Sequence, residues 1–484
     1  MTDHQQARAA QRAWAHKPVR ARLRILRRFR ADLARSAQEL AGTVACNVPG
    51  SLQRAPADTL VAEVLPLAEA CRFLEQEAEF ILRTRRESSH SRPFWLRSTD
   101  VAIERAPLGV VLVIGPGNYP LFLAGVQVLQ ALVAGNAVLW KPAATGVACA
   151  HALRAMLVAN GLPAELLVVV DAAPAAAHSA IEAGVDKVIL TGSAATGEAV
   201  QRALAASATP SIMELSGCDA VFVLEGAELA RVVDALCFGM RLNGSATCMA
   251  PRRVFVAAPL HDLLADMLGG AMDLLAPGEL LESARNGLLD LITEATLEGA
   301  HLLRDGLLPE QVQAGTVRPT LLSGVTPEMR IAQADVFAPV LSLLRFTTLE
   351  QAAAMYEQCP YALTAAIFGP EKQARILARN LTAGTILFND VIVSTADPRA
   401  SFGGRKRSGF GTTRGREGLL AMTAPRTVIR QRSTSMLPYQ HTGPAHESFF
   451  AGYVQAMHAH GWRARLAGWR AMGRAAPMLR PRKH

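Results

Sequence analysis

Residues 110–142 read VVLVIGPGNYPLFLAGVQVLQALVAGNAVLWKP. A valine-rich apolar run is followed by a Gly/Pro joint, a helix expected over Leu121 to Ala134, and a second apolar run, AVLWKP. Short apolar strands separated by helices, with Gly and Pro at the joints, are typical of right-handed βαβ crossovers under a parallel sheet. The stretch therefore predicts an α/β fold.

The same alternation extends in both directions along the chain. It includes the expected strands VAIERA (101–106), LLVVVD (166–171), KVILTGS (187–193) and SIMELSG (211–217), and a helix over Val147 to Ala159. This pattern predicts a doubly wound, dinucleotide-type domain. A second series between Arg231 and about Gly404, with RVFVAA, VLSLLRF, TAAIF and GTILFN, predicts a further α/β domain and a ligand cleft between the two.

Composition and charge exclude several classes of protein. Half of the residues are hydrophobic and 19% are charged, which indicates a globular chain. The start, MTDHQQARAAQRAW, lacks the pattern of a secretory signal, so we expect a cytoplasmic protein. The formal net charge is +9, but residues 461–484 contain seven Lys or Arg and no acid. The remainder is nearly neutral, and no nucleic-acid partner is indicated.

The cysteines and histidines indicate thiol chemistry rather than a metal site. The seven cysteines are scattered without CxxC spacing, and His441, His446, His458 and His460 form no convincing ligand set. We expect reduced thiols, of which one can be catalytic while the others pack as small apolar residues. No metal is predicted.

Four stretches carry the chemistry: GPGNYP (115–120), TGSAATG (191–197), MELSGC (213–218) and NGSATC (243–248). Taken singly, each is explained as well by turn geometry at a strand-to-helix joint. In this order and spacing they resemble the aldehyde dehydrogenase superfamily. The resemblance extends from about Arg8 to Arg430 and includes VFAPVLSLLRF (336–346) and SFGGRKRSGFG (401–411).

The resemblance implies three catalytic residues. Cys248 matches the nucleophile, whose thiolate attacks the aldehyde carbon and then carries a thiohemiacetal and a thioester. Glu214 matches the general base, and Asn118 matches the asparagine that, with the Cys248 backbone N–H, stabilises the oxyanion. The competing interpretations are a buried structural thiol, a solvated strand-end carboxylate and a turn asparagine.

The resemblance also implies an NAD or NADP site. Lys141 corresponds to the lysine that contacts the adenosine ribose, and Asn389 to an asparagine near the substrate. The remaining cofactor residues implied by the family are Gly192, Ser193 and Gly197 at the pyrophosphate, Asp335 at the nicotinamide ribose and Phe337 beside the ring. Ala144 stands where members that prefer NAD usually have Glu, so NADP is equally compatible with the sequence.

Departures from the family pattern keep other functions open. The usual ELGGK is ELSGC here, with Ser216 and Cys218 replacing Gly and Lys, and Ala246 replaces a common Gln. A coenzyme A-dependent acylating dehydrogenase or acyl reductase is one alternative, although such enzymes often lack the base at the Glu214 position. A catalytically silent structural relative is another. Release of free acid without coenzyme A would distinguish them.

The early position of Asn118 resembles the short class of the superfamily, which acts on medium- or long-chain aliphatic and aromatic aldehydes. The apolar residues that follow it, Leu121, Phe122, Leu123 and Val126, are compatible with an apolar substrate tunnel and equally with ordinary helix packing. We expect an apolar aldehyde to be oxidised to its carboxylic acid.

The resemblance implies an aldehyde dehydrogenase-like architecture. It consists of a doubly wound Rossmann-type cofactor domain, an α/β catalytic domain and a small oligomerisation sheet. The expected boundaries are 1–216 for the N-terminal helices and the NAD(P)-binding domain, 217–404 for the catalytic domain, 405–432 for a return segment and oligomerisation strand, and 433–484 for a basic C-terminal extension. TVIRQR (427–432) is the candidate strand that joins subunits into a homodimer or homotetramer.

The C-terminal extension has no counterpart in the family. Trp462, Leu466 and Trp469 recur at helical spacing among arginines, which is the pattern of a basic amphipathic helix. One hypothesis is peripheral contact with an anionic membrane surface. The alternatives are a solvated tail and a segment that covers a partner subunit.

Overall fold

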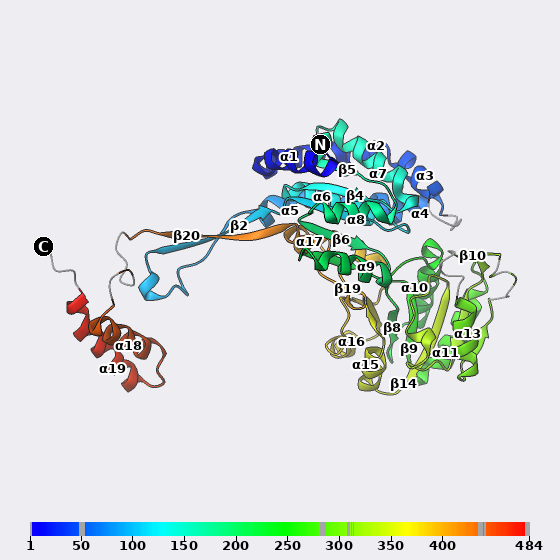
Figure 1. Ribbon diagram of the computed structural model, residues 1–484. Helices are drawn as coiled ribbons and strands as arrows, with labels where there is room; N and C mark the ends of the chain where they lie inside the picture. Colours follow the sequence, from blue (N-terminus) through cyan, green and yellow to red (C-terminus); the bar gives the residue numbers. More distant parts are fainter. Residues whose placement is uncertain are drawn as a thin grey trace. The chain divides into compact units, whose positions relative to one another are not determined.

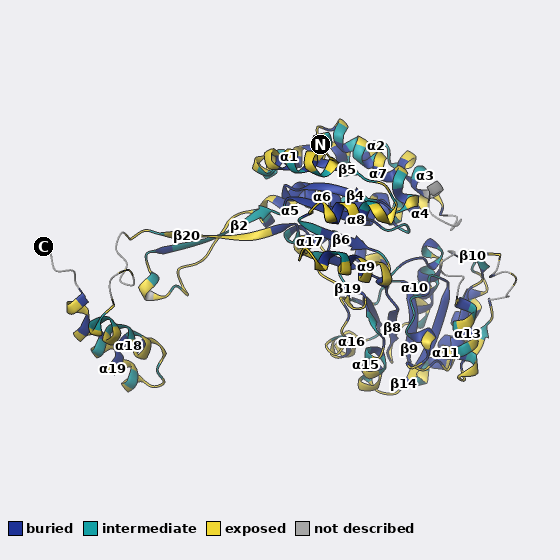
Figure 2. Cartoon of the chain, viewed as in Figure 1, coloured by how far each residue is buried: buried dark blue, intermediate teal, exposed yellow. Residues whose placement is uncertain are grey.

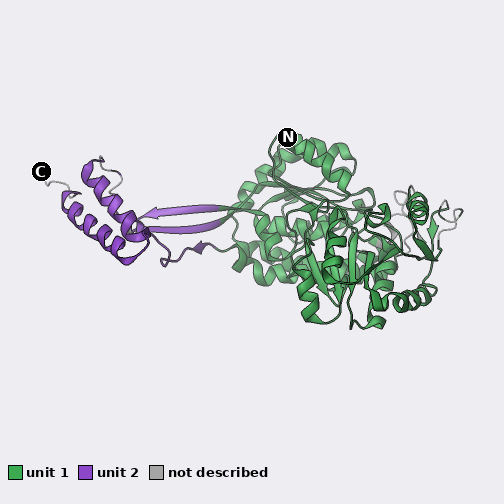
Figure 3. Ribbon diagram, turned by 90° about the horizontal axis from the view of Figure 1, so that it is seen from below, with its two compact units in different colours: residues 1–83, 105–425 green, residues 84–104, 426–484 purple. Residues whose placement is uncertain are grey.

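The structure is a computed structural model that describes residues 2–47, 54–280, 287–306, 314–433 and 442–479, and the single residues 310, 312 and 439. It comprises two compact units (Figure 3). The larger contains Met1–Arg83 and Arg105–Pro425, and the smaller contains Thr84–Glu104 and Arg426–His484. No helix within the described ranges combines the length and hydropathy needed to cross a bilayer.

A six-stranded sheet lies in the larger unit (Figure 1). Its parallel strands are β3 (Val110–Ile114), β4 (Ala137–Lys141), β5 (Leu167–Val169), β6 (Lys187–Thr191) and β7 (Ser211–Glu214), and β19 (Gly409–Phe410) joins antiparallel to β7. The intervening helices are α6 (Phe122–Ala134), α7 (Val147–Ala159), α8 (Pro174–Glu182) and α9 (Ala194–Ala205). Every residue of β3 and α6 is buried, which explains their unbroken apolar sequence (Figure 2).

The order of these strands creates a binding edge. It is β19-β7-β6-β3-β4-β5, so the chain builds outward from β3 through β4 to β5 and then returns to the other side of β3 with β6 and β7. The direction in which successive strands are added to the sheet therefore reverses between β3 and β6. Ligands of doubly wound sheets bind outside the carboxyl ends of the strands at such a switch point.

Helices at the start of the chain precede this sheet. They are α1 (Asp3–His16), α2 (Val19–Arg35), α3 (Ala37–Asn47), α4 (Pro56–Thr59), the π-helix η1 (Leu60–Val64) and α5 (Leu65–Leu82). The apolar side of α2, including Leu26 and Phe29, is buried, and α2 packs against α5. Helix α17 (Gly415–Ala421) contacts α5 and α6 from the far end of the sequence.

A seven-stranded sheet follows, with the order β11-β13-β14-β9-β8-β16-β17. Its strands are β8 (Asp219–Val223), β9 (Pro251–Ala257), β11 (His301–Arg304), β13 (Thr320–Ser323), β14 (Val340–Phe346), β16 (Thr364–Phe368) and β17 (Thr385–Phe388). All pairings are parallel except that of β11. Its helices are α10 (Leu229–Arg241), α11 (His261–Met272), α13 (Leu288–Leu297), α15 (Leu349–Glu357) and α16 (Glu371–Ala378).

Three smaller sheets complete the described strands. Two are two-stranded: β10 (Gly278–Glu279) with β12 (Thr316–Val317), and β15 (Tyr361–Ala362) with β18 (Arg405–Lys406). The third has the order β1-β2-β20, from β1 (Arg85–Arg86), β2 (Thr99–Pro107) and β20 (Thr423–Gln431). The prediction that VAIERA opens the doubly wound alternation is wrong, because this segment lies in β2. Eight of its nine strand residues are only partly buried, unlike a strand covered on both faces.

Helices α18 (Pro444–His458) and α19 (Trp462–Ala475) lie near the end of the described chain and pack against each other, and the short 3-10 helix η10 (Ala476–Leu479) follows them. Gly461, with φ of 88°, takes the left-handed backbone conformation immediately before α19. The helical spacing of Trp462, Leu466 and Trp469 predicts α19, whereas no sequence pattern considered above predicts α18.

Candidate active site

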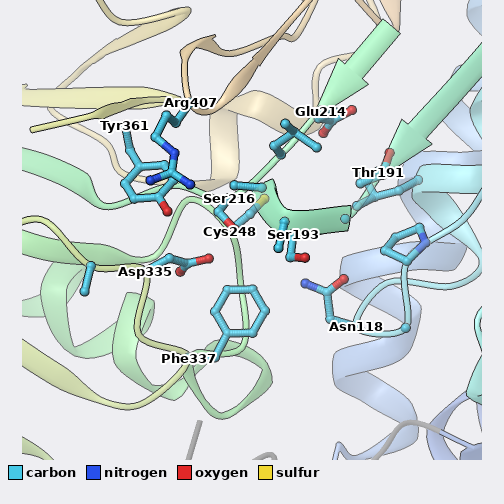
Figure 4. A pocket seen from close by; sticks show the side chains of 18 of the residues that line it. Asn118, Thr191, Ser193, Glu214, Ser216, Cys248, Asp335, Phe337, Tyr361 and Arg407 are labelled. Atoms are coloured by element: carbon cyan, nitrogen blue, oxygen red, sulfur yellow. The ribbon is translucent and has the colours of Figure 1, made fainter. Parts of the chain in front are cut away.

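A cavity of about 700 Å³ lies between the two large sheets. On one side are residues from the carboxyl ends of β3, β6 and β7, next to the switch point; on the other are residues that precede β9, β14 and β16. A volume of several hundred Å³ is ordinary for a small-molecule site. Figure 4 shows Cys248 near its middle, with Asn118, Asp335 and Phe337 around it.

The loop before Cys248 has an unusual backbone. Asn243, Gly244 and Ser245 all have positive φ, at 51°, 55° and 68°. This conformation is energetically costly for Asn243 and Ser245, which, unlike glycine, carry a Cβ. The buried guanidinium of Arg252 donates to the Ser245 hydroxyl at 2.7 Å and to its carbonyl at 2.6 Å. These contacts hold the loop so that the Cys248 thiol is partly open to the cavity.

The ELSGC segment packs directly beneath that loop. A Cβ on Gly217 would lie 2.4 Å from the Cys248 carbonyl oxygen, so this position requires glycine. Ser216 hydrogen-bonds the Asp335 carboxylate, and Cys218 is buried with its sulfur 3.6 Å from the Ala332 carbonyl. The altered segment therefore keeps the glycine that the loop before Cys248 needs.

Glu214 ends β7 and is almost fully buried. The Thr413 hydroxyl donates to one carboxylate oxygen at 3.0 Å, and the other oxygen has no hydrogen-bond partner within the described residues. In Figure 4 the carboxylate is turned away from the Cys248 sulfur. Burial raises the pKa of the Glu214 carboxyl, and the Arg414 guanidinium and the Thr413 hydroxyl oppose this change.

Burial also raises the pKa of the Cys248 thiol, and the negative charge of Glu214 adds to the effect. The thiol is therefore protonated at neutral pH in this conformation. A base that can approach the sulfur is needed to generate the thiolate. Glu214 already lines the cavity, but its carboxylate could take that proton only after turning toward the Cys248 sulfur.

Asn118 follows β3 and reaches across to the nucleophile loop. Its side-chain amide donates to the Ala246 carbonyl at 2.9 Å, and its side-chain oxygen accepts from the Tyr119 backbone N–H at 3.0 Å. The Tyr119 hydroxyl lies 2.6 Å from the Thr247 hydroxyl. Asn118 and Tyr119 thus contact Ala246 and Thr247 of the loop before Cys248. These contacts fix Asn118 beside Cys248.

A buried ion pair between Arg54 and Glu63 supports the loop that contains Asn118. The Glu63 carboxylate accepts the backbone N–H groups of Leu121 at 2.7 Å and Phe122 at 3.0 Å, at the start of α6. Arg54 donates to the Asn118 carbonyl at 3.0 Å and lies 5.0 Å from the Tyr119 ring centroid. The pair therefore links the N-terminal helices to the loop that positions Asn118.

We expect Glu63→Ala to lower the free energy of unfolding by about 3–5 kcal/mol, because it leaves the Arg54 charge buried without a partner. Chemical denaturation measures this change. Glu79→Ala is the matched control, since Glu79 pairs with Arg20 on the surface, where solvent screens the charges, and should change the free energy of unfolding far less. Equal effects of the two substitutions would contradict the supporting role of the buried pair.

Four of the six cofactor residues expected from the sequence line the same cavity. Gly192, Ser193, Asp335 and Phe337 line it. The Ser193 hydroxyl accepts the Thr196 N–H at 3.2 Å and caps α9, whose first backbone N–H groups are available to an anion.

The Asp335 carboxyl, which lines this cavity, carries a polar atom that is unpaired in the described part of the chain. Its Oδ1 is buried and has no hydrogen-bond partner within the described residues, so a ligand hydroxyl would satisfy it. Burial raises the pKa of Asp335 to about 6, opposed by the Arg252 guanidinium and the Ser216 hydroxyl.

Three expected site residues lie outside the cavity lining. Lys141 is at the carboxyl end of β4, the same edge of the sheet. Gly197 is buried in α9, where a Cβ would lie 2.7 Å from a Leu215 methyl, so it serves helix packing. Asn389 follows β17 at its carboxyl end, and its side chain accepts the Gly369 N–H at 3.1 Å. This location differs from the expected one near the substrate, and the contact with Gly369 gives Asn389 a structural role.

Sequence reasoning missed Thr413, Arg414, Arg54 and Glu63. Arg414 is buried with φ of 60°, donates to the Thr395 carbonyl at 2.8 Å and lies 4.3 Å from the Phe402 ring centroid. The only sequence signal was the nearness of Thr413 and Arg414 to SFGGRKRSGFG. None of the four forms a local pattern with the residue that it supports.

Comparison with known proteins identifies the group to which this arrangement belongs. Residues 3–428 match the model of the aldehyde dehydrogenase family. The chain belongs to this family.

Two curated aldehyde dehydrogenase relatives are each 30% identical to the chain. One is the 4,4'-diapolycopene aldehyde oxidase of Methylomonas sp, with 93% of this chain and 86% of the relative covered. The other is the geranial dehydrogenase of Castellaniella defragrans, with 87% and 88% covered. A solved Mycobacterium tuberculosis aldehyde dehydrogenase in complex with NAD+ is 26% identical, with a TM-score of 0.79 and coverage of 89% and 90%.

The predicted fold class and family are therefore confirmed. The protein is an NAD(P)-dependent aldehyde dehydrogenase that oxidises an aldehyde. The acylating and silent alternatives are not favoured by these relatives.

Proposed function

We propose that Cys248, Glu214 and Asn118 carry out aldehyde oxidation, on the observation that all three line one cavity at the switch point of the doubly wound sheet. Glu214 turns from its contact with Thr413 toward the Cys248 sulfur and removes the thiol proton. The Cys248 sulfur then attacks the aldehyde carbon, which forms the C–S bond of a thiohemiacetal.

The oxygen of the aldehyde becomes negatively charged in this step. An amide NH₂ has two hydrogens, and only one of those on Asn118 is needed for the Ala246 carbonyl. The other, with the Cys248 backbone N–H, can stabilise the oxyanion. When bound, NAD(P) would accept a hydride from the carbon of the thiohemiacetal. Loss of this hydride leaves a thioester on Cys248.

Glu214 releases the thiol proton to solvent and then acts a second time as the carboxylate. It removes a proton from a water molecule that attacks the thioester carbon, the Cys248 thiolate leaves, and the carboxylic acid is released. A raised pKa suits this role, because a base with a pKa closer to neutral accepts protons more effectively.

We infer that NAD(P) is held along the carboxyl edge of the six-stranded sheet. The residues present fit it: the N-terminus of α9 with Gly192 and Ser193 suits the pyrophosphate, and the unpartnered Asp335 oxygen suits a ribose hydroxyl. Phe337 would border the nicotinamide and Lys141 the adenosine ribose. In this proposal residues 1–216 form the nucleotide-binding domain, and 217–404 supply the nucleophile together with Asp335 and Phe337 at the nicotinamide end.

Nucleotide choice should respond to residue 144, three residues after Lys141 and exposed. We expect Ala144→Glu to lower kcat/KM with NADP by about tenfold or more relative to NAD, because a carboxylate there repels the 2′-phosphate. Ala144→Gln is the matched control without charge. A similar loss with both nucleotides would contradict this placement of the ribose.

We propose an apolar aliphatic or aromatic aldehyde as the substrate. Leu123 lines the cavity, whereas Phe122 and Val126 line a separate small hollow with Phe73. The two curated relatives are named for a diapolycopene aldehyde and for geranial, which are also apolar.

A panel of aldehydes with NAD and NADP tests the whole proposal through absorbance of the reduced nucleotide. Decanal, benzaldehyde and geranial should give higher kcat/KM than acetaldehyde. Succinate semialdehyde belongs in the panel as an aldehyde that carries a carboxylate. A preference for that acid over decanal would overturn the apolar assignment. Acid release without coenzyme A supports hydrolysis by Glu214.

We also infer a homodimer or homotetramer built through β20. This strand contains TVIRQ of the predicted segment, lies at the edge of its three-stranded sheet and exposes Val428 and Ile429. A long open edge strand is a template for pairing with a second copy. Light scattering of the full-length protein measures the size, and a monomer would contradict the inference.

A further inference from the structure

The outer surface of α19 carries an apolar stripe. Trp462, Leu466 and Trp469 are 70%, 39% and 48% exposed, and with Gly473 they recur at steps of four, three and four residues. Residues at these steps lie on one face of an α-helix. Two tryptophans and a leucine are therefore presented together rather than scattered.

The packing of the two helices fixes where this stripe points. The buried residues of α19, Gly468, Met472 and Ala475, lie on a different side of the helix and face α18. A Cβ on Gly468 would lie 2.3 Å from the Ala456 backbone nitrogen, so the helices touch backbone to backbone. The contact fixes the rotation of α19, and the stripe is turned away from α18.

Arginines border the stripe on both sides. Arg465 lies along one edge and Arg463, Arg470 and Arg474 along the other, by the same helical geometry, and all four are exposed. Glu447 is the only acidic residue between 433 and 484. The surface thus combines an aromatic and aliphatic centre with a positive border.

We propose that the outer face of α19 docks on an anionic membrane surface. Tryptophan is favoured at the level of the lipid headgroups, and the arginines would meet the lipid phosphates with their stems along the acyl boundary. The positive charge of this face favours an anionic membrane over a second copy of the same face, because pairing two such faces would bring eight arginines together. Nucleic acid would satisfy the arginines but would leave the apolar centre without a partner.

Docking would place the enzyme where apolar aldehydes accumulate. This consequence rests on the function proposed above, whereas docking itself does not. The enzyme would then take its substrate from a reaction that leaves an aldehyde on a lipid-soluble molecule.

Co-sedimentation of the full-length protein tests the proposal, with vesicles of phosphatidylcholine alone or of phosphatidylcholine and phosphatidylglycerol in equal parts. We expect binding only to the anionic vesicles at low salt, and release at high salt. The triple change Arg463→Gln, Arg470→Gln, Arg474→Gln should weaken binding by about a hundredfold. Trp462→Ser with Trp469→Ser should weaken it by about tenfold or more.

The matched control removes three exposed arginines elsewhere, Arg12→Gln, Arg24→Gln and Arg379→Gln, and should bind as the unaltered protein does. Turnover of benzaldehyde in the same preparations separates the two proposals. Absence of binding to anionic vesicles by an active enzyme overturns docking and leaves the function standing. Docking would also be overturned if the control variant lost as much vesicle binding as the α19 variant. Tighter binding to duplex DNA than to vesicles would overturn it too, as would a smaller oligomer when the two tryptophans are changed.

Discussion

Cys248→Ala is expected to abolish aldehyde oxidation. Without the sulfur no thiohemiacetal forms, so there is no carbon from which a hydride can leave, and kcat should fall by more than about 10⁴-fold. Absorbance of reduced nucleotide with decanal and benzaldehyde measures the loss. Nucleotide binding should remain, because the proposed contacts at α9 and Asp335 do not involve the thiol.

Cys237→Ala is the matched control for this change. Cys237 lies on α10, is partly exposed, and does not line the cavity. This variant should keep normal turnover. Turnover that persists in Cys248→Ala, or that disappears equally in both variants, would contradict the assignment of Cys248 as the nucleophile.

Glu214→Gln should lower steady-state turnover by about 10²–10⁴-fold, since the amide cannot accept a proton from the thiol or from water. The amide still fits beside the Thr413 hydroxyl, so folding should be preserved. At high pH hydroxide can generate the thiolate, and the variant should then reduce nearly one equivalent of nucleotide and stall as the thioester. Stopped-flow absorbance follows this burst.

The pH profile of the unaltered enzyme provides the second test of Glu214. A base acts in its ionised form, and burial raises the pKa of this carboxyl, so turnover should increase with pH above the range in which an exposed glutamate titrates. Glu214→Gln should lose this rise. The same rise in the variant would assign the titration to another group and contradict the role of Glu214.

The fold was accessible from the sequence where burial leaves a pattern. β3, β4 and β6 lie in the interior of a parallel sheet, so their apolar runs are nearly unbroken, and α7 begins and ends where its sequence predicts. VAIERA was assigned to the wrong sheet because a short alternating strand does not reveal its partner. The sequence patterns do not predict β8 or β13, although both are buried, because a short apolar run does not by itself distinguish a strand from a buried helix segment.

The candidate site was accessible where chemistry depends on residue type within a motif. Cys248, Glu214 and Asn118 come from separate motifs, and the fold brings them to one cavity. The supporting residues were not accessible, because Glu63 acts on the start of α6 from 58 residues away and Thr413 acts on Glu214 from 199. Asn389 was misjudged for a related reason: its position at the end of a strand does not indicate which edge of the sheet faces the ligand.

The most direct test of the central claim is to find the covalent intermediate. Glu214→Gln would be mixed with decanal and nucleotide at high pH, quenched in acid and digested, and the peptides weighed by mass spectrometry. A decanoyl group on the peptide containing Cys248, in an amount matching the nucleotide reduced, is the predicted result. Nucleotide reduction without an acyl group on Cys248, or with the group on another residue, would contradict the mechanism.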